Sequence, residues 1–276
     1  MSGPPAAGPT GAARAPGVQR IAAAFSGHGR RAALMPYLMG GFPDLDGSLA
    51  IGEAYADAGA DLVELGVPFS DPLADGPVIH AAATRALAAG ATLPGVLDVG
   101  RALAERVPVV AMCYVNPILA RGVERFAHEL AERGISGLIV PDLPLEESAA
   151  VRAACDAAGV ALVPLVAPTT PDDRMAAIGA AARGFVYTVS VTGTTGERSA
   201  LPSGLRGLLA RARASTAVPV AAGFGIATPE QAAAAADVGA DGVIVGTRLV
   251  RAASEAADPA AAVRGLVEGL SAALER

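Results

Sequence analysis

The chain has 276 residues, of which 52% are hydrophobic, with a formal net charge of -6 and an isoelectric point of about 5.1. This acidic balance supplies no basic face, so we expect no nucleic-acid partner, and no apolar run reaches the roughly 18 residues that a membrane-spanning helix needs. The length is enough to bury one large core, and a (β/α)8 barrel is a common way to use such a length in a single domain.

The N-terminal segment, residues 1–17, is rich in Ala, Gly and Pro and lacks the apolar stretch of a signal peptide. We expect a disordered tail there, followed by one catalytic domain over residues 18–276 and a cytoplasmic location. The first element of that domain, Val18 to Phe25, is expected to be a short helix that closes the bottom of a barrel.

From Ala33 onward, runs rich in Val, Ile and Leu alternate with Ala-rich helical runs, which is the pattern of a parallel sheet with crossover helices. Five glycines each end a helix just before a strand, and three of them stand at equal intervals. The strands predicted are Leu34–Met39, Leu62–Gly66, Val107–Cys113, Gly137–Pro141, Ala161–Val166, Phe185–Ser190, Val218–Ala222 and Gly242–Gly246, and the glycines are Gly59, Gly134, Gly159, Gly184 and Gly239. Eight such units predict an α/β fold of the (β/α)8 TIM barrel type, with an open doubly wound sheet as the alternative.

Two connections are longer than a simple barrel requires. Between the second and third strands, Pro77 to Leu87 and Pro94 to Glu105 predict an extra helix, and Pro259 to Leu274 predicts a final helix after the eighth strand. The expected architecture is therefore a TIM barrel with an extra N-terminal helix and additional helices after strands 2 and 8.

Two carboxylates mark the end of the second strand. Glu64 lies between Val63 and Leu65 in a run that reads as buried strand, where an unpaired charge is costly, and Asp75 follows in the loop beyond. Active sites of this architecture lie at the carboxyl ends of the strands, so the pair predicts proton-transfer chemistry. The alternative for Glu64 is a structural pairing with an arginine, which stabilises a fold poorly.

Glycines follow the seventh and eighth strands. Gly225 and Gly246 would let backbone N–H groups approach an anion, and the helix N-terminus after each adds a positive dipole. Two glycines at the two strand ends expected to bind phosphate predict a phosphate site, although either alone would read as a tight turn. Thr247, directly after Gly246, would add a hydroxyl to this site.

A long polar, Gly-rich loop follows the sixth strand and runs from Tyr187 to Pro202. It predicts a lid, in which Thr195 would hydrogen-bond a loop carboxylate on closing and Gly196 would add a third backbone donor to the phosphate. A surface loop without function is the alternative.

The chain lacks several catalytic groups. It contains no lysine, which excludes a Schiff base or a covalently held pyridoxal phosphate on this chain. Cys113 and Cys155 form no CxxC motif and are expected to be reduced thiols, and the histidines His28, His80 and His128 show no metal-ligand spacing. No metal site is expected.

These motifs together are those of one family. They are Glu64 to Pro77, Tyr114-Val-Asn-Pro117, Pro141-Asp-Leu-Pro144, Ala167 to Thr170, Tyr187 to Gly196, Gly223-Phe-Gly225 and Gly246-Thr247. From about Gly17 onward the sequence resembles the tryptophan synthase α subunit family. The run Pro-Phe-Ser-Asp-Pro-Leu-Ala-Asp-Gly-Pro inside the first motif is the longest and most specific.

The resemblance implies a carbon-carbon lyase (EC 4.2.1.20) that cleaves indole-3-glycerol phosphate by a retro-aldol reaction into indole and glyceraldehyde 3-phosphate, in L-tryptophan biosynthesis. It implies that Glu64 protonates the indole ring carbon and accepts the side-chain hydroxyl proton, and that Asp75 binds the indole N–H. Without lysine or metal, the protonated indole must itself be the electron sink. Burial should raise the pKa of Glu64, whereas Asp75 in a polar loop should stay ionised.

The resemblance also implies an indole pocket and a partner. Tyr37, Met112, Ile139 and Tyr187, with Leu165, would line the pocket, although ordinary barrel core is the alternative for each apolar residue. No cofactor is expected on this chain, and a β subunit carrying pyridoxal phosphate would join it in an α2β2 heterotetramer. Asp71, Asn116 and Pro144 would face that subunit.

Some residues depart from the family pattern. Phe42 stands where Asp is common, His80 where Gln is usual and Thr247 where Ser is common; His80 is expected to be a helix surface or interface residue with no catalytic role. An indole-glycerol-phosphate synthase would need lysines that this chain lacks. A self-sufficient indole-glycerol-phosphate lyase and a catalytically silent activating subunit are the remaining alternatives.

Overall fold

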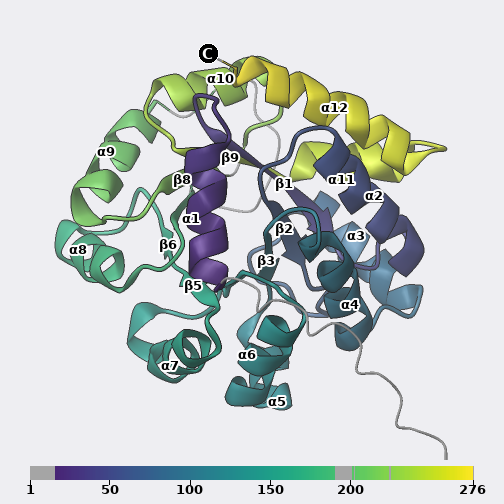
Figure 1. Cartoon of the computed structure of the whole chain (residues 1–276), viewed down its shortest axis with the longest axis horizontal. Coiled ribbons are helices and arrows are strands. Elements are labelled where there is room, and N and C mark those ends of the chain that lie inside the picture. The colour runs from purple at the N-terminus through teal and green to yellow at the C-terminus, as the bar shows by residue number, and fades with distance from the viewer. Residues whose placement is uncertain (1–15, 190–200, 202, 224, 276) are drawn as a thin grey trace, which may run out of the picture.

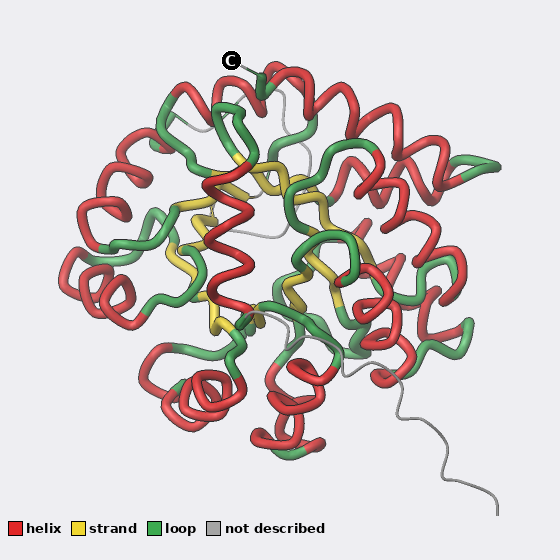
Figure 2. The backbone as a smooth tube through the Cα atoms, viewed as in Figure 1, coloured by secondary structure: helices red, strands yellow, loops and turns green. Residues whose placement is uncertain are grey.

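The computed structural model describes residues 16–189, 201, 203–223 and 225–275. A ring of parallel strands lies at the centre, with helices around it (Figures 1 and 2). The strands are β1 (Ala33–Met39), β2 (Val63–Gly66), β3 (Val109–Met112), β4 (Gly137–Ile139), β5 (Ala161–Val163), β6 (Leu165–Val166), β7 (Val186–Val189), β8 (Val220–Gly223) and β9 (Gly242–Val245). Their order, β5-β4-β3-β2-β1-β9-β8-β7-β6, follows the chain around the ring and excludes an open doubly wound sheet.

The ring of strands closes at Pro164. This residue separates β5 from β6; β5 pairs with β4, and β6 pairs with β7. Tyr187 N–H donates to the Pro164 carbonyl at 3.0 Å, which continues the ladder across the break. Because proline has no N–H to donate, the predicted fifth strand is divided in two, and each half joins a different neighbour. All eight predicted strands are therefore present, the fifth as two short pieces.

The helices lie outside the strands. They are α2 (Leu45–Asp57), α3 (Pro77–Ala88), α4 (Leu93–Ala104), α5 (Val115–Arg121), α6 (Val123–Glu132), the 3-10 turn η1 (Leu145–Glu147), α7 (Ala149–Ala158), α8 (Asp172–Ala181), α9 (Leu205–Ser215), α10 (Pro229–Asp237), α11 (Thr247–Glu255) and α12 (Pro259–Ala273). The additional helices expected after the second and eighth strands are present as α3 with α4 and α11 with α12. None of the helices in the described part of the chain is long and apolar enough to cross a membrane.

One helix was not predicted. α5 follows β3 and precedes α6, where the sequence analysis treated Val115 to Pro117 only as part of a motif. The Asp142 carboxylate, which comes from the loop after β4, accepts a hydrogen bond from Val115 N–H at 2.9 Å. This contact satisfies an N–H at the start of α5. Because the acceptor is distant in sequence, no local sequence pattern predicted the helix.

The expected N-terminal helix is α1 (Gly17–Gly27), which lies across the middle of the ring in Figure 1. Its buried Ile21 and Phe25 enter the inner core of the barrel. Gly137, Gly184 and Gly242 stand where added β-carbons would press on these two side chains, so the missing side chains make room for the helix. Of the predicted tail, Pro16 and Gly17 are described, with Gly17 opening α1, and residues 1–15 lie outside the described residues.

The predicted helix-ending glycines all adopt left-handed backbone conformations. Gly59, Gly134, Gly159, Gly184 and Gly239 have positive φ values between 68° and 109°. Residues with a β-carbon avoid this region, so glycine is the natural residue where a helix turns into the next strand. The repeat read from the sequence is therefore a repeat of the same backbone turn.

Candidate active site

Glu64 lies inside the barrel on β2, and its side chain is 1% exposed. Strand alternation explains the position, because Val63 and Leu65 pack into the outer core while Glu64 points to the opposite face of the strand. Neither carboxylate oxygen has a hydrogen-bond partner among the described residues. The predicted alternative, pairing with an arginine, is thus not found there.

The environment of Glu64 favours its neutral form. Burial, reinforced by the charge of nearby Asp75, raises the pKa of Glu64 to about 8. Both effects penalise the carboxylate, one by removing water and the other by like-charge repulsion. At neutral pH the side chain therefore carries a proton that it can donate, and afterwards it can take one back.

Asp75 lies in the loop between β2 and α3 and is half-buried. The Tyr114 hydroxyl, carried at the end of β3, donates to Asp75 Oδ1 at 2.9 Å and accepts from Ala74 N–H at 3.0 Å. Burial raises the pKa of Asp75, while the Tyr114 hydrogen bond and nearby His80 act in the opposite direction. The loop that carries Asp75 is thus more buried than the sequence indicated, and the Tyr114 hydrogen bond is the larger of the two effects that favour the ionised form.

Two tyrosines lie beside Glu64. Tyr37 is its neighbour in register on β1, and Tyr187 stands on β7, both nearly fully buried. Burial, followed by the charges of Asp75 and Glu64, raises the pKa of Tyr37, and burial followed by Glu64 raises the pKa of Tyr187. Both hydroxyls therefore stay protonated beside Glu64.

Each of these rings lies over a glycine. A β-carbon at Gly66 would collide with the Tyr37 ring and hydroxyl, and one at Gly223 would collide with the Tyr187 ring. Gly66 and Gly223 therefore hold space for aromatic rings at the top of the barrel. Their role was not predicted, although both close strands, as the other site residues do.

The remaining predicted pocket residues lie in or against the inner core. Ile139 is fully buried there, and Met112 and Leu165 are partly buried against it. Met112 pairs in register with Ile139 and with Gly66. The structure therefore brings Tyr37, Met112 and Tyr187 to the same end of the barrel as Glu64, with Ile139 in the core of the barrel.

The two predicted phosphate turns are neighbours. β8 pairs with β9, so Gly225 after β8 and Gly246 after β9 lie at the same edge of the sheet. Gly225 has a φ of 83°, and Gly246 is the N-cap of α11, which Thr247 opens. The helix dipole and the first N–H groups of α11 make this edge favourable for an anion. The other two predicted contacts, Thr195 and Gly196, lie outside the described residues.

Sequence analysis gave no role to Tyr114, the direct partner of Asp75. A signal was present, because Tyr114 follows the third predicted strand within one of the quoted motifs. The structure also locates two of the three departures from the family pattern. Phe42 is buried, with the Arg85 guanidinium 4.8 Å from the centre of its ring, and His80 is exposed on α3 as expected.

The loops at this end of the barrel expose apolar side chains. Leu73, in the Asp75 loop, is 83% exposed, and Leu119 on α5 is 58% exposed. Asp71, Asn116 and Pro144, the predicted partner-facing residues, are exposed too. Within the residues that the structure describes, no three His, Cys, Asp or Glu side chains gather as metal ligands would.

Comparison with known proteins gives one consistent result. The family model for the tryptophan synthase alpha chain matches residues 25–273. A tryptophan synthase alpha chain of Synechococcus sp. (strain CC9902) is 51% identical over 239 residues, which cover 86% of this chain and 89% of the relative.

Solved structures agree with the sequence matches. A chain of Mycobacterium tuberculosis tryptophan synthase superposes with a TM-score of 0.87 at 38% identity, covering 95% of this chain and 100% of that one. A chain from the tryptophan synthase a2b2 complex of Pyrococcus furiosus superposes with a TM-score of 0.82 at 36% identity, covering 87% and 98%.

Proposed function

This chain belongs to the tryptophan synthase alpha chain family, and on that premise we propose that Glu64 and Asp75 carry its proton transfers. The family cleaves indole-3-glycerol phosphate to indole and glyceraldehyde 3-phosphate in tryptophan biosynthesis, which makes the chain a lyase. The observation that carries the proposal is Glu64 itself, which is fully buried, has no hydrogen-bond partner for either carboxylate oxygen within the described part of the chain, and has a neighbouring carboxylate in Asp75.

Glu64 acts first as an acid and then as a base. Its proton passes to the indole ring carbon that bears the glycerol chain, giving an indolenine that accepts electrons. The resulting carboxylate then takes the proton of the neighbouring side-chain hydroxyl; the carbon-oxygen double bond forms, and the carbon-carbon bond breaks with its electron pair returning to the ring. A pKa of about 8 suits both steps near neutral pH.

Asp75 stabilises the intermediate. Protonation of the ring places positive charge on the indole nitrogen, and an ionised Asp75 accepting a hydrogen bond from that N–H offsets it. The hydrogen bond from Tyr114 supports this role because it favours the ionised carboxylate and fixes its orientation. Tyr114 is thus a positioning residue rather than a reacting one.

The substrate is held at its two ends. Tyr37, Met112, Ile139 and Tyr187 form the apolar and aromatic surroundings of the indole, supported by their place around Glu64. At the phosphate end, Gly225 and Gly246 present backbone N–H groups, Thr247 adds its hydroxyl, and the start of α11 adds its dipole. Gly196 and Thr195, outside the described residues, are proposed to complete the phosphate site and the lid.

The chain works with a β subunit in an α2β2 assembly in the cytoplasm, and the pyridoxal phosphate belongs to that subunit. The exposed Leu73 and Leu119 support this partner, because large apolar side chains on a loop face fit an interface better than water. The Pyrococcus furiosus relative is described as a subunit of an a2b2 complex. This chain itself needs no metal or cofactor for the proposed steps.

The deciding experiment incubates the purified chain with indole-3-glycerol phosphate and follows indole and glyceraldehyde 3-phosphate, with and without added β subunit. Slow release that rises strongly with the partner supports the proposal. Fast release by the chain alone would indicate a self-sufficient lyase, and no release in either mixture would indicate a catalytically silent activating subunit.

A further inference from the structure

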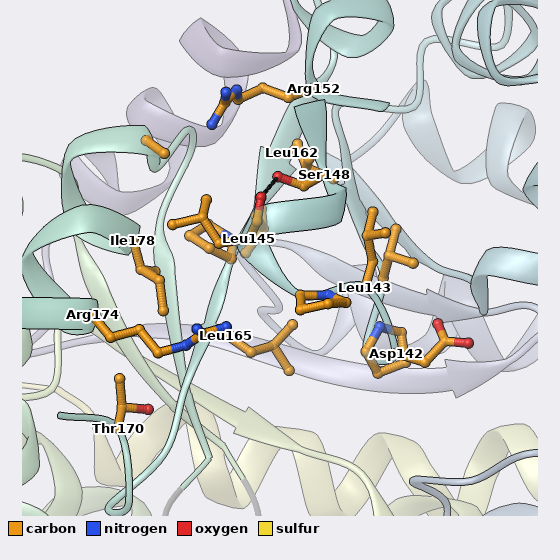
Figure 3. Close-up of a pocket in the computed structure, with 16 residues that line it drawn as sticks. Asp142, Leu143, Leu145, Ser148, Arg152, Leu162, Leu165, Thr170, Arg174 and Ile178 are labelled. Carbon is orange, nitrogen blue, oxygen red and sulfur yellow. Dashed lines mark hydrogen bonds between the residues drawn. The ribbon is translucent and has the colours of Figure 1, made fainter. Parts of the chain in front are cut away.

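A cavity of about 380 Å³ lies apart from the catalytic pair, between α7 and α8 and over strands β5 and β6 (Figure 3). Its third wall is the loop after β4, residues 140–145. Among the described residues, neither Glu64 nor Asp75 lines it, and neither do Gly225 and Gly246 of the proposed phosphate site. The cavity is therefore separate from the catalytic carboxylates, and it shares one residue, Leu165, with the predicted indole pocket.

The middle of the cavity is apolar. Leu145 and Leu143 come from the loop after β4, Leu165 from β6, and Ile178 from α8, and Figure 3 labels all four among the residues that line the space. The Ser148 hydroxyl, at the start of α7, is already engaged, because it donates to the Leu145 carbonyl at 2.7 Å. An occupant of the middle must therefore be apolar as well.

Two arginines line the cavity, and they differ in whether their charge is paired. Arg174, on α8, is paired with Glu146 through both ends of its guanidinium, with Nη2 to Oε2 at 2.8 Å, so its charge is already balanced. Arg152, on α7, is half-buried, and its guanidinium has no ion pair or hydrogen bond among the described residues. In Figure 3 its side chain extends from α7 toward α8 at one end of the cavity. A partly desolvated guanidinium without a partner favours an anion beside it.

Asp142 places a negative charge on one side of the cavity. It lies with Leu143 on the side opposite Arg174 in Figure 3, and its Oδ1 accepts from Val115 N–H at 2.9 Å. An anionic group would be repelled from that side and attracted to Arg152. The charges therefore give an occupant one orientation, with its anionic group at Arg152 and its apolar body among the leucines.

We propose that the cavity between α7 and α8 is a second small-molecule site, which binds an amphipathic anion with an apolar body and one carboxylate held by Arg152. The proposal is independent of the roles assigned to Glu64 and Asp75, because no residue of that pair takes part.

The test uses 4-phenylbutyrate as the probe and 4-phenylbutyramide, its neutral analogue, as the matched ligand. Isothermal titration calorimetry is run on the full chain and on its mixture with the β subunit. The Arg152→Gln variant removes the cation from the cavity, and Arg206→Gln removes an exposed arginine from the first turn of α9, away from it.

Loss of a charge-assisted hydrogen bond corresponds to a weakening of about tenfold or more. We expect saturable binding of the carboxylate that weakens by that factor in Arg152→Gln and for the amide, and that stays within about twofold in Arg206→Gln. Absence of saturable binding, equal binding of carboxylate and amide, or unchanged binding in Arg152→Gln would overturn the proposal. Loss of binding on addition of the β subunit would overturn it too, by assigning the cavity to the subunit interface.

Discussion

The Tyr114 hydroxyl donates a 2.9 Å hydrogen bond to Asp75 Oδ1 while accepting one from the backbone of the same loop, at Ala74. One side chain just after β3 thus orients a carboxylate in the loop after β2 and favours its ionised form against the effect of burial. The ring packs on Phe69, with centroids 5.5 Å apart, so the loop is also held by aromatic contact.

Tyr114→Phe keeps the ring and removes the donor. Because the hydrogen bond lowers the pKa of Asp75 against the effect of burial, its loss raises that pKa further. We expect kcat to fall by about tenfold and the acidic limb of the pH-rate profile to move to higher pH, with little change in melting temperature. An unchanged acidic limb would separate Tyr114 from Asp75.

Glu64→Gln removes the acid-base group but keeps its shape. General acid-base catalysis contributes about a hundredfold to ten-thousandfold, so indole release should fall within that range while circular dichroism and β-subunit binding stay intact. Glu53→Gln, at an exposed position on α2, is the matched control and should keep full activity. Substantial activity in Glu64→Gln would refute the assignment of the acid.

The raised pKa of Glu64 makes stability depend on pH. Between the ordinary value of 4.5 and the folded value of about 8, the folded chain keeps a proton that the unfolded chain has lost. Stability therefore falls as pH rises through this window, by at most about 1.4 kcal/mol per pH unit. Urea unfolding between pH 5 and 8 should show a shallower decline for Glu64→Gln than for the wild type. Parallel curves for the two proteins would contradict a raised pKa.

Gly66→Ala places a methyl group against the Tyr37 ring. The ring must move from its place beside Glu64, so we expect both lower activity and a loss of stability of about 1–3 kcal/mol, as for other overpacked cores. Gly265→Ala, on α12 with open space around the new methyl group, is the control and should not destabilise the chain. Equal activity and unfolding midpoints for the two variants would show that the space at Gly66 is not required.

Much of the fold could be predicted because the sequence repeats the same local pattern of strand, helix and glycine. The apolar strand runs, the Ala-rich helices and the helix-ending glycines recur along the chain, and the structure confirms the barrel and its additional helices. The features that were not predicted depend on contacts between residues far apart in the sequence. Pro164 divides the fifth strand because the two halves serve different neighbours, and α5 begins at Val115 because Asp142 binds its first N–H.

For the site, the sequence singled out Glu64 because a charge in an apolar strand is costly, and the structure places it buried, with no hydrogen-bond partner among the residues described. It also placed Gly225 and Gly246 at strand ends that prove adjacent. It did not identify Tyr114, whose meaning depends on a contact with a residue 39 positions away. Nor could it identify Gly66 and Gly223, because the rings above them come from other strands.

The sequence by itself determined the period of the barrel, the absence of any lysine for covalent catalysis, and the two carboxylates, one in the second strand and one in the loop after it. These properties are local, since periodicity, composition and spacing are written along one chain. Only the tertiary structure decided the pKa of Glu64, the hydrogen bond from Tyr114 to Asp75, and the position of Arg152 at the cavity between α7 and α8. Electrostatics and hydrogen bonding depend on distance and burial in space, and the barrel creates both by bringing the ends of separate strands together.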